Sequence, residues 1–254
     1  MTKPLVCFKP NPDATLRLFC FPFAGGSAQV YYDWPKVLPP SIELHAVELP
    51  GRGRRFAEEP LTALGPLVRS LVPHIQRQAD KPFIFFGHSL GGLIAFELAR
   101  RLQQLGGSSP LHLYVSAARA PQIERPHPSI FALPDAQFIE AIRCYDGTPE
   151  AILENQELME LLLPSLRADF SVLENYRYQP IPLLTCPLSA FSGKADEITR
   201  AEEVQPWEAQ TQSQFVHQFV EGGHFFVNQP AFIRIFSQTV QRAYLTRPHS
   251  SSSA

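Results

Sequence analysis

The sequence predicts an α/β fold, with a mostly parallel sheet and helices on both of its faces. Two patterns indicate it: short apolar runs of strand length, and amphipathic helical patterns between them. A third observation is a Gly-x-Ser-x-Gly segment that joins one of these runs to a helical pattern. The chain has 254 residues, 44% of them hydrophobic, which is enough for one substantial core.

Six apolar runs predict the strands. Several are apolar almost throughout, as expected for strands that are covered on both faces. They span residues 16–23, 44–49, 83–86, 111–115, 188–191 and 215–220.

Helices are predicted where apolar residues recur every three or four positions. These patterns cover residues 64–75, 94–105 and 232–240, and Pro230 suits the first turn of the last helix. Because helices alternate with strands, the connections are those of a parallel sheet.

One stretch, residues 121–180, interrupts the alternation. It carries two helical patterns, 138–142 and 158–173, and no strand pattern between them. We expect a helical lid over the carboxyl ends of the strands, although these helices could instead thicken one face of the sheet. Residues 1–120 and 181–246 then form the core, and the serine-rich residues 247–254 form a disordered tail.

Composition excludes several classes of protein. A formal net charge of -2 gives no reason to expect a nucleic-acid or membrane partner. The beginning of the chain does not resemble a signal peptide, and no apolar run is long enough to cross a bilayer. The four cysteines show no metal-type spacing, and Cys20 and Cys186 lie in apolar runs as reduced core residues would. A cytoplasmic protein without a metal is expected.

The segment 87–92, Gly-His-Ser-Leu-Gly-Gly, has the pattern of a nucleophile elbow. Glycines at 87 and 91 leave room for a sharp turn that exposes the hydroxyl of Ser89. The backbone N–H of Leu90, at the start of the following helix, points to where an oxyanion would form. The alternative is an ordinary glycine-rich turn without a catalytic role.

A serine nucleophile needs a base, and His224 is the best placed of the eight histidines. It follows the last predicted strand, in a loop with two glycines. His217, on that strand, is the main competitor. His88 lies within the elbow, too close in sequence to reach the Ser89 hydroxyl.

The acid that orients the base should lie between the serine and the histidine in the chain. Asp196 directly follows the predicted strand 188–191, so it leaves the sheet at its carboxyl end, and its neighbour Glu197 could substitute. Asp169 falls within a helical pattern and is expected to be a helix-surface or interhelical charge. Asp146 is expected in a turn.

A second oxyanion donor is expected in the loop after the first predicted strand, FPFAGGS at 21–27. Ala24 is the candidate, and Phe23 is the alternative. A phosphate-binding loop is disfavoured because the segment has neither Gly-Lys-Ser nor Gly-x-Gly-x-x-Gly.

Five segments occur in order along the chain: FPFAGGS at 21–27, LPGR at 49–52, GHSLGG at 87–92, LRADF at 166–170 and GGHFF at 222–226. In this set the chain resembles the type II thioesterases of polyketide and nonribosomal peptide synthesis, and also the medium-chain thioesterases of animal fatty-acid synthesis. The resemblance extends from about residue 16 to residue 244. One departure is Leu90, where relatives often carry methionine.

The resemblance implies an α/β-hydrolase fold with a helical lid and a catalytic triad of Ser89, Asp196 and His224. The implied activity is hydrolysis of acyl groups from the phosphopantetheine arm of an acyl or peptidyl carrier protein, with editing favoured over product release. No resident cofactor is implied, and a monomer is expected.

Two other functions stay open: a small-molecule carboxylesterase or lipase, and a non-catalytic binding protein with the same fold. The basic cluster Arg52, Arg54 and Arg55 could meet an acidic carrier protein, although a solvated loop is the simpler interpretation.

Overall fold

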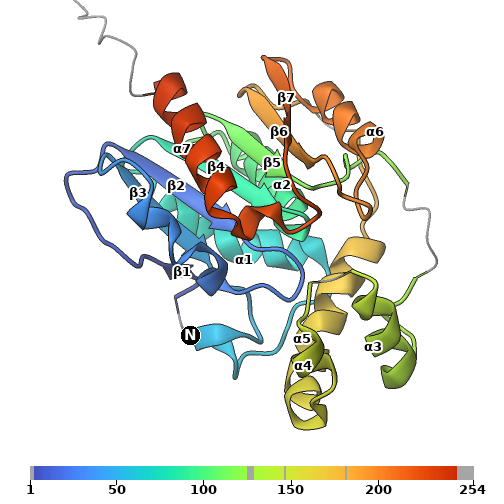
Figure 1. Cartoon of the computed structure of the whole chain (residues 1–254). Coiled ribbons are helices and arrows are strands. Elements are labelled where there is room, and N and C mark those ends of the chain that lie inside the picture. Colours follow the sequence, from blue (N-terminus) through green and yellow to red (C-terminus); the bar gives the residue numbers. More distant parts are fainter. Residues whose placement is uncertain (1–2, 125–128, 146, 181, 245–254) are drawn as a thin grey trace, which may run out of the picture.

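The computed structural model describes residues 3–124, 129–145, 147–180 and 182–244. A seven-stranded sheet in the order β1-β3-β2-β4-β5-β6-β7 forms its centre, and every strand except β1 runs parallel to its neighbours (Figure 1). The strands are β1 (Leu5–Val6), β2 (Leu16–Phe21), β3 (Ile42–Val47), β4 (Phe83–His88), β5 (Leu113–Ser116), β6 (Leu188–Gly193) and β7 (Phe215–Val220). The expected tail, 247–254, and Asp146 lie outside the described residues.

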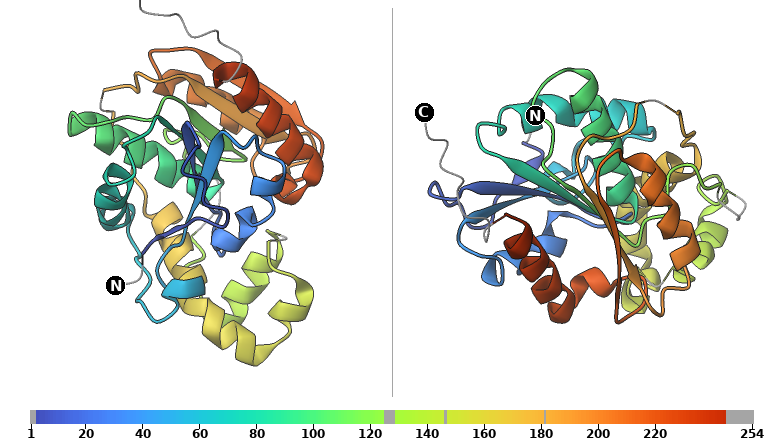
Figure 2. Two further views of the ribbon diagram at one scale, coloured as in Figure 1. Left: turned by 90° about the vertical axis from the view of Figure 1, so that its left-hand side faces the viewer. Right: turned by 90° about the horizontal axis from the view of Figure 1, so that it is seen from above.

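Helices cover both faces of the sheet, so the predicted α/β fold is confirmed. Seen from above in Figure 2, α1 (Leu64–Gln76) and α2 (Leu90–Gln104) lie on one side of the sheet and α7 (Pro230–Tyr244) lies on the other. Strand β4 shows how the sequence produces the two layers. Phe85 belongs to the hydrophobic cluster that contains α1 and α2, whereas Phe86 packs with α7, because successive side chains of a strand point to opposite faces.

The structure departs from the expected element boundaries in two instructive places. Strand β1 was not predicted, since two residues carry no alternation, and it pairs antiparallel with β3 at the edge of the sheet. Helix α2 begins at Leu90 rather than at residue 94. Its first turn contains Gly91 and Gly92, which give no apolar signal although both are buried.

Three helices lie between β5 and β6: α3 (Asp135–Arg143), α4 (Glu150–Leu153) and α5 (Gln156–Glu174). In Figure 1 they stand below the sheet, beyond the carboxyl ends of its strands. They share a small core of their own, in which the rings of Phe138 and Phe170 lie 5.7 Å apart. Two residues of α5, Val172 and Leu173, instead join the cluster under α1 and α2, so this helix ties the insertion to the sheet.

Short elements complete the chain. They are η1 (Ala28–Tyr31), η2 (Trp34–Lys36), η3 (Gly53–Arg55), α6 (Ala201–Val204), η4 (Gln205–Gln210) and η5 (Phe226–Asn228). None of the helices in the described part of the chain combines the length and apolar character that crossing a bilayer requires.

The cysteines Cys20 and Cys186 are buried and unpaired, as expected of core thiols. Burial raises the pKa of the Cys186 thiol to about 11, so this group stays protonated at neutral pH.

Candidate active site

Ser89 stands between β4 and α2 in a backbone conformation that few residues adopt, with φ 53° and ψ -117°. Its backbone N–H donates to the carbonyl of Ser116, 2.8 Å away, which fixes the turn against β5. Two glycines make the turn possible. A Cβ on Gly87 would lie 2.2 Å from the carbonyl oxygen of Gly91, and one on Gly91 would lie 2.0 Å from that of Phe21.

His224 and Asp196 form a buried pair next to this turn. The Nδ1 atom of His224 lies 2.9 and 3.1 Å from the two carboxylate oxygens of Asp196. The carboxylate is held in turn by the backbone N–H groups of Ile198 and Thr199, each 2.9 Å from Oδ1. With Nδ1 donating to the carboxylate, the Nε2 atom of His224 carries the lone pair of a general base.

The loops that carry this pair are bound to each other. The backbone N–H of Ala195 donates to the carbonyl of Gly222 at 3.0 Å, and a Cβ on Gly193 would lie 2.6 Å from that same carbonyl oxygen. The close approach brings Asp196 and His224 together from the ends of β6 and β7, although they are 28 positions apart in the chain.

His88, the residue before Ser89, is completely buried beneath the pair. Its Nδ1 atom is 3.0 Å from the hydroxyl of Ser116, and its ring lies 5.4 Å from the ring of His224. Burial lowers the pKa of His88 well below its usual value, and the neighbouring His224 adds to the effect. His88 is therefore a neutral support for the base, and its ring contact shows that His224 lies beside the elbow.

The alternative residues are engaged elsewhere or lie apart. His217 bonds the hydroxyl of Ser192 through Nε2 and the amide of Gln205 through Nδ1, at 2.8 and 2.9 Å. Glu197 is exposed at the rim of the cavity, whereas Asp196 is fully buried against His224. The structure thus pairs the predicted base with the predicted acid.

The backbone N–H groups of Ala24 and Leu90 are the expected oxyanion donors. Within the described residues neither donates to a protein acceptor. Leu90 is the first residue of α2, where the helix dipole adds positive potential. Ala24 follows β2 and lines the same cavity as Ser89. Phe23, the alternative donor, lines the same cavity, and its N–H likewise donates to no acceptor among the described residues, so both residues of this loop can supply the second donor.

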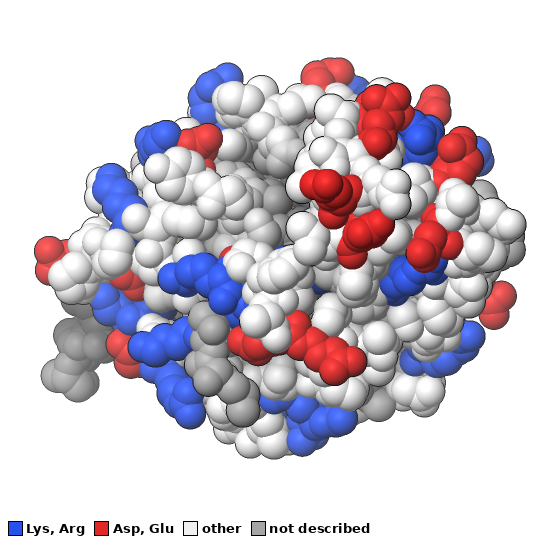
Figure 3. Space-filling model, turned by 90° about the horizontal axis from the view of Figure 1, so that it is seen from below, with Lys and Arg blue, Asp and Glu red and all other residues white. Residues whose placement is uncertain are grey.

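A cavity of about 1050 Å³ opens over these groups, and both Ser89 and His224 line it. Figure 3 looks at this end of the molecule from below and shows a hollow among mostly uncharged residues. The cavity walls come from the sheet loops and from α3 and α5, with Leu93, Ile142, Leu166, Phe170 and Leu173 among the apolar contributors. It is large enough for a flexible acyl chain next to the nucleophile.

The interpretation of the basic cluster as a solvated or docking loop is wrong for two of its three members. Arg52 is 5% exposed and Arg55 is 8% exposed. Arg55 bonds the carboxylate of Glu58 and the carbonyl of Glu48, so it closes the loop in which it lies. Only Arg54 is exposed.

Asp169 is likewise not a helix-surface charge. It is buried, and it binds the guanidinium of Arg52 and the backbone N–H of Gly25. The sequence contained a signal for this contact, because both residues lie in the ordered segments LPGR and LRADF. Helical periodicity alone could not show that the two segments meet.

Among the described residues, one group has the side chains of a metal site: Cys7, Glu43 and His45, whose ligand atoms lie within 4.8 Å of one another. It is near the amino end of β3, far along the strand from the cavity. Glu43 already binds Arg17 and His45, so its charge is neutralised within the protein.

Comparison with known proteins agrees with this arrangement. A family model described as a thioesterase domain matches residues 16–240. The chain is 43% identical over 222 residues to the gramicidin S biosynthesis protein GrsT of Aneurinibacillus migulanus, covering 87% of each chain. It is 39% identical over 222 residues to the thioesterase PikA5 of Streptomyces venezuelae, covering 87% of this chain and 79% of that relative. The solved structure of the type II thioesterase BorB, from the borrelidin biosynthetic cluster, matches with a TM-score of 0.83 at 35% identity, over 93% of this chain and 97% of BorB. The chain therefore belongs to the thioesterase family.

Proposed function

We propose that this protein hydrolyses acyl groups from the phosphopantetheine arm of acyl or peptidyl carrier proteins and so clears misprimed or stalled units from a synthase. The observation that carries the proposal is a cavity of a thioesterase-family chain that Ser89, Ala24 and His224 line together, with Asp196 bound to His224 behind it. The names of the relatives support the biosynthetic setting, since GrsT acts in gramicidin S biosynthesis and BorB comes from the borrelidin cluster.

The reaction proceeds in two acyl transfers. Ser89 attacks the thioester carbonyl while His224 takes its proton, and Asp196 holds the imidazole and stabilises its charge. The C–S bond then breaks, and the departing thiolate receives that proton. A water molecule then gives a proton to the same imidazole and attacks the acyl-serine. The ester C–O bond breaks, the oxygen of Ser89 receives that proton, and the carboxylic acid is released.

Negative charge develops on the carbonyl oxygen in both steps. The N–H groups of Ala24 and Leu90 would stabilise it in the low-dielectric cavity, and removing one such donor typically costs about 10²–10³ in kcat. The proposed steps need no resident cofactor, because the phosphopantetheine arrives with the substrate and the imidazole of His224 moves the proton.

Helices α3–α5 act in this proposal as a lid over the acyl group. Their residues form one wall of the cavity, and they share a hydrophobic core of their own, while Val172 and Leu173 hold α5 to the main core. We also propose that the enzyme is cytoplasmic, in keeping with its unpaired core cysteines, and that it acts as a monomer.

Two measurements test the function. Ser89→Ala should lower the hydrolysis of an acyl-carrier thioester by at least about 10³-fold while the thermal unfolding temperature stays close to wild type. Near wild-type turnover of this variant would refute the mechanism. In wild-type enzyme, kcat/KM should be higher for an acyl-carrier protein than for the isolated acyl-pantetheine, and higher for that thioester than for the matching oxygen ester. A preference for the oxygen ester would instead indicate a carboxylesterase.

A further inference from the structure

A buried ion pair connects the lid to the loop that carries Ala24. Asp169, on α5, accepts from both terminal nitrogens of Arg52, with Nη1–Oδ2 and Nη2–Oδ1 distances of 2.5 and 2.8 Å. The side chains are 5% and 6% exposed, respectively, and lie 117 positions apart in the chain. Such a bidentate contact fixes the relative orientation of the two side chains as well as their distance.

The same carboxylate also reaches the loop directly. Its Oδ2 atom accepts from the backbone N–H of Gly25 at 2.7 Å, while Arg52 donates to the carbonyl of Gly26 at 3.2 Å. Gly25 is the residue after Ala24, so the pair holds the peptide units that directly follow the expected oxyanion donor.

Helix α5 also touches this loop one turn earlier. A Cβ on Gly25 would lie 2.7 Å from the Cδ2 atom of Leu166, and Gly25 has a φ of +79° that favours glycine. Leu166 and Asp169 lie three positions apart, so they project from one face of the helix. That face therefore sets the position of the loop by packing and by charge together.

We propose that Asp169 and Arg52 are positioning residues for catalysis, which hold the N–H of Ala24 at the distance and direction that the oxyanion requires. This inference rests on the function proposed above. A displacement of about 1 Å in a catalytic group can lower the rate about 10²-fold, so a fixed loop is valuable here. Because Leu166 and Phe170 of α5 also line the cavity, the helix that contacts the acyl group is the helix that holds the oxyanion loop.

The test compares binding of the ground state with binding of the transition state. Asp169→Asn keeps the shape of the side chain but removes its negative charge. The new amide NH2 group would also face an N–H donor of Arg52 or Gly25, with which it cannot form a hydrogen bond. We expect kcat for an acyl-pantetheine thioester to fall about 10–100-fold with KM changed less than about threefold. Affinity for a trifluoromethyl ketone, which forms a hemiketal oxyanion with Ser89, should fall by the same factor as kcat/KM. Affinity for a non-hydrolysable thioether analogue should stay constant.

The amino end of the sheet offers a matched control. Glu43 is also a buried carboxylate that binds an arginine, Arg17, and a backbone N–H, that of Asn11. Glu43→Gln should lower stability and leave the kcat of the folded enzyme unchanged within about twofold. Arg52→Lys keeps the positive charge but cannot form the bidentate contact with Asp169. If Asp169→Asn does not fold, the same measurements are made on Arg52→Lys.

The outcomes separate the two proposals. If Ser89→Ala retains activity, the proposed function fails. If Ser89→Ala is inactive but Asp169→Asn and Arg52→Lys keep wild-type kcat and wild-type affinity for the trifluoromethyl ketone, only the positioning role is overturned. The role is also overturned if Asp169→Asn weakens the thioether analogue and the ketone equally, because the pair would then serve substrate binding alone.

Discussion

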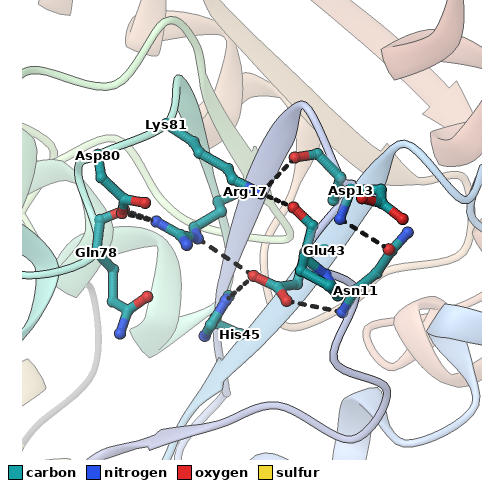
Figure 4. Close-up of polar contacts among 10 residues, drawn as sticks. Asn11, Asp13, Arg17, Glu43, His45, Gln78, Asp80 and Lys81 are labelled. Carbon is teal, nitrogen blue, oxygen red and sulfur yellow. Dashed lines mark hydrogen bonds and ion pairs between the residues drawn. The ribbon is translucent and has the colours of Figure 1, made fainter.

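The two ends of the sheet contain similar buried networks. At the carboxyl end, Asp169 binds Arg52 and the N–H of Gly25. At the amino end, Figure 4 shows Glu43 between Arg17, His45 and the N–H of Asn11, with Arg17 extending to Asp80 before β4. Each network joins segments that are distant in the chain through one carboxylate.

The two networks differ in the chain segments whose backbone N–H groups they bind. Asn11 lies in the segment that leads into β2, and the network around it fastens the loops at that end. Gly25 lies in the loop that lines the cavity beside Ser89, so the same chemistry there sets the position of a reacting group. A buried ion pair alone is weak evidence for stability or for function, and its surroundings decide which it serves.

The largest expected effect lies at the carboxyl end. Asp196→Asn should lower kcat about 10⁴-fold, the size of loss seen when a triad aspartate is replaced in serine proteases, because His224 would then hold the wrong tautomer. Hydrolysis of an acyl-pantetheine thioester measures it. Stability should change little, since the amide still accepts from Ile198 and Thr199. An unchanged kcat would mean that another acid orients the base.

Helix α2 allows the next comparison, because it has a glycine near each end. Gly91→Ala should destabilise the fold by about 4 kcal/mol or more, since the new Cβ would lie 2.0 Å from the carbonyl oxygen of Phe21. Gly106→Ala, with no atom within 4 Å and a φ of +66°, should cost only about 1 kcal/mol of backbone strain. Urea unfolding of both variants measures the difference. Equal costs would show that the elbow is not tightly packed.

At the amino end, Glu43→Gln should lower the free energy of unfolding by about 3 kcal/mol, because it leaves Arg17 buried with less compensation. Denaturant unfolding at neutral pH measures this loss. A stable variant with reduced kcat would reverse the distinction between the two ends.

The smallest effect is a pH dependence of stability. His112, just before β5, is partly buried, and burial lowers its pKa from 6.5 to about 4. The folded state therefore binds fewer protons than the unfolded state between these values, so stability is full above pH 6.5 and falls as the pH drops toward 4.

His112→Asn checks this assignment. Its unfolding free energy should fall less steeply between pH 6.5 and 4 than that of wild type, while His45 and His88, whose pKa values are also lowered by burial, retain the rest of the slope. Identical slopes in the two proteins would assign the acid sensitivity to other groups.

Sequence patterns predicted the long elements and the order of the site residues. Strand 215–220 was predicted with its observed bounds, and the segments carrying Ser89, Asp196 and His224 each follow a predicted strand. Patterns failed where an element is very short or its first turn is glycine, as in β1 and at the start of α2. They also failed for Arg52 and Asp169, because a charged residue is expected at the surface unless its partner is known.

The sequence by itself determined the α/β class, the elbow and the residues able to form a triad, because periodicity and local sterics act over a few neighbouring positions. Only the tertiary structure decided which distant groups meet. It placed Nδ1 of His224 2.9 Å from Asp196, and it turned Asp169 toward Arg52 and Gly25 rather than toward water. Such contacts depend on the register of whole helices and strands, which is set by packing of the complete core and which no local pattern contains.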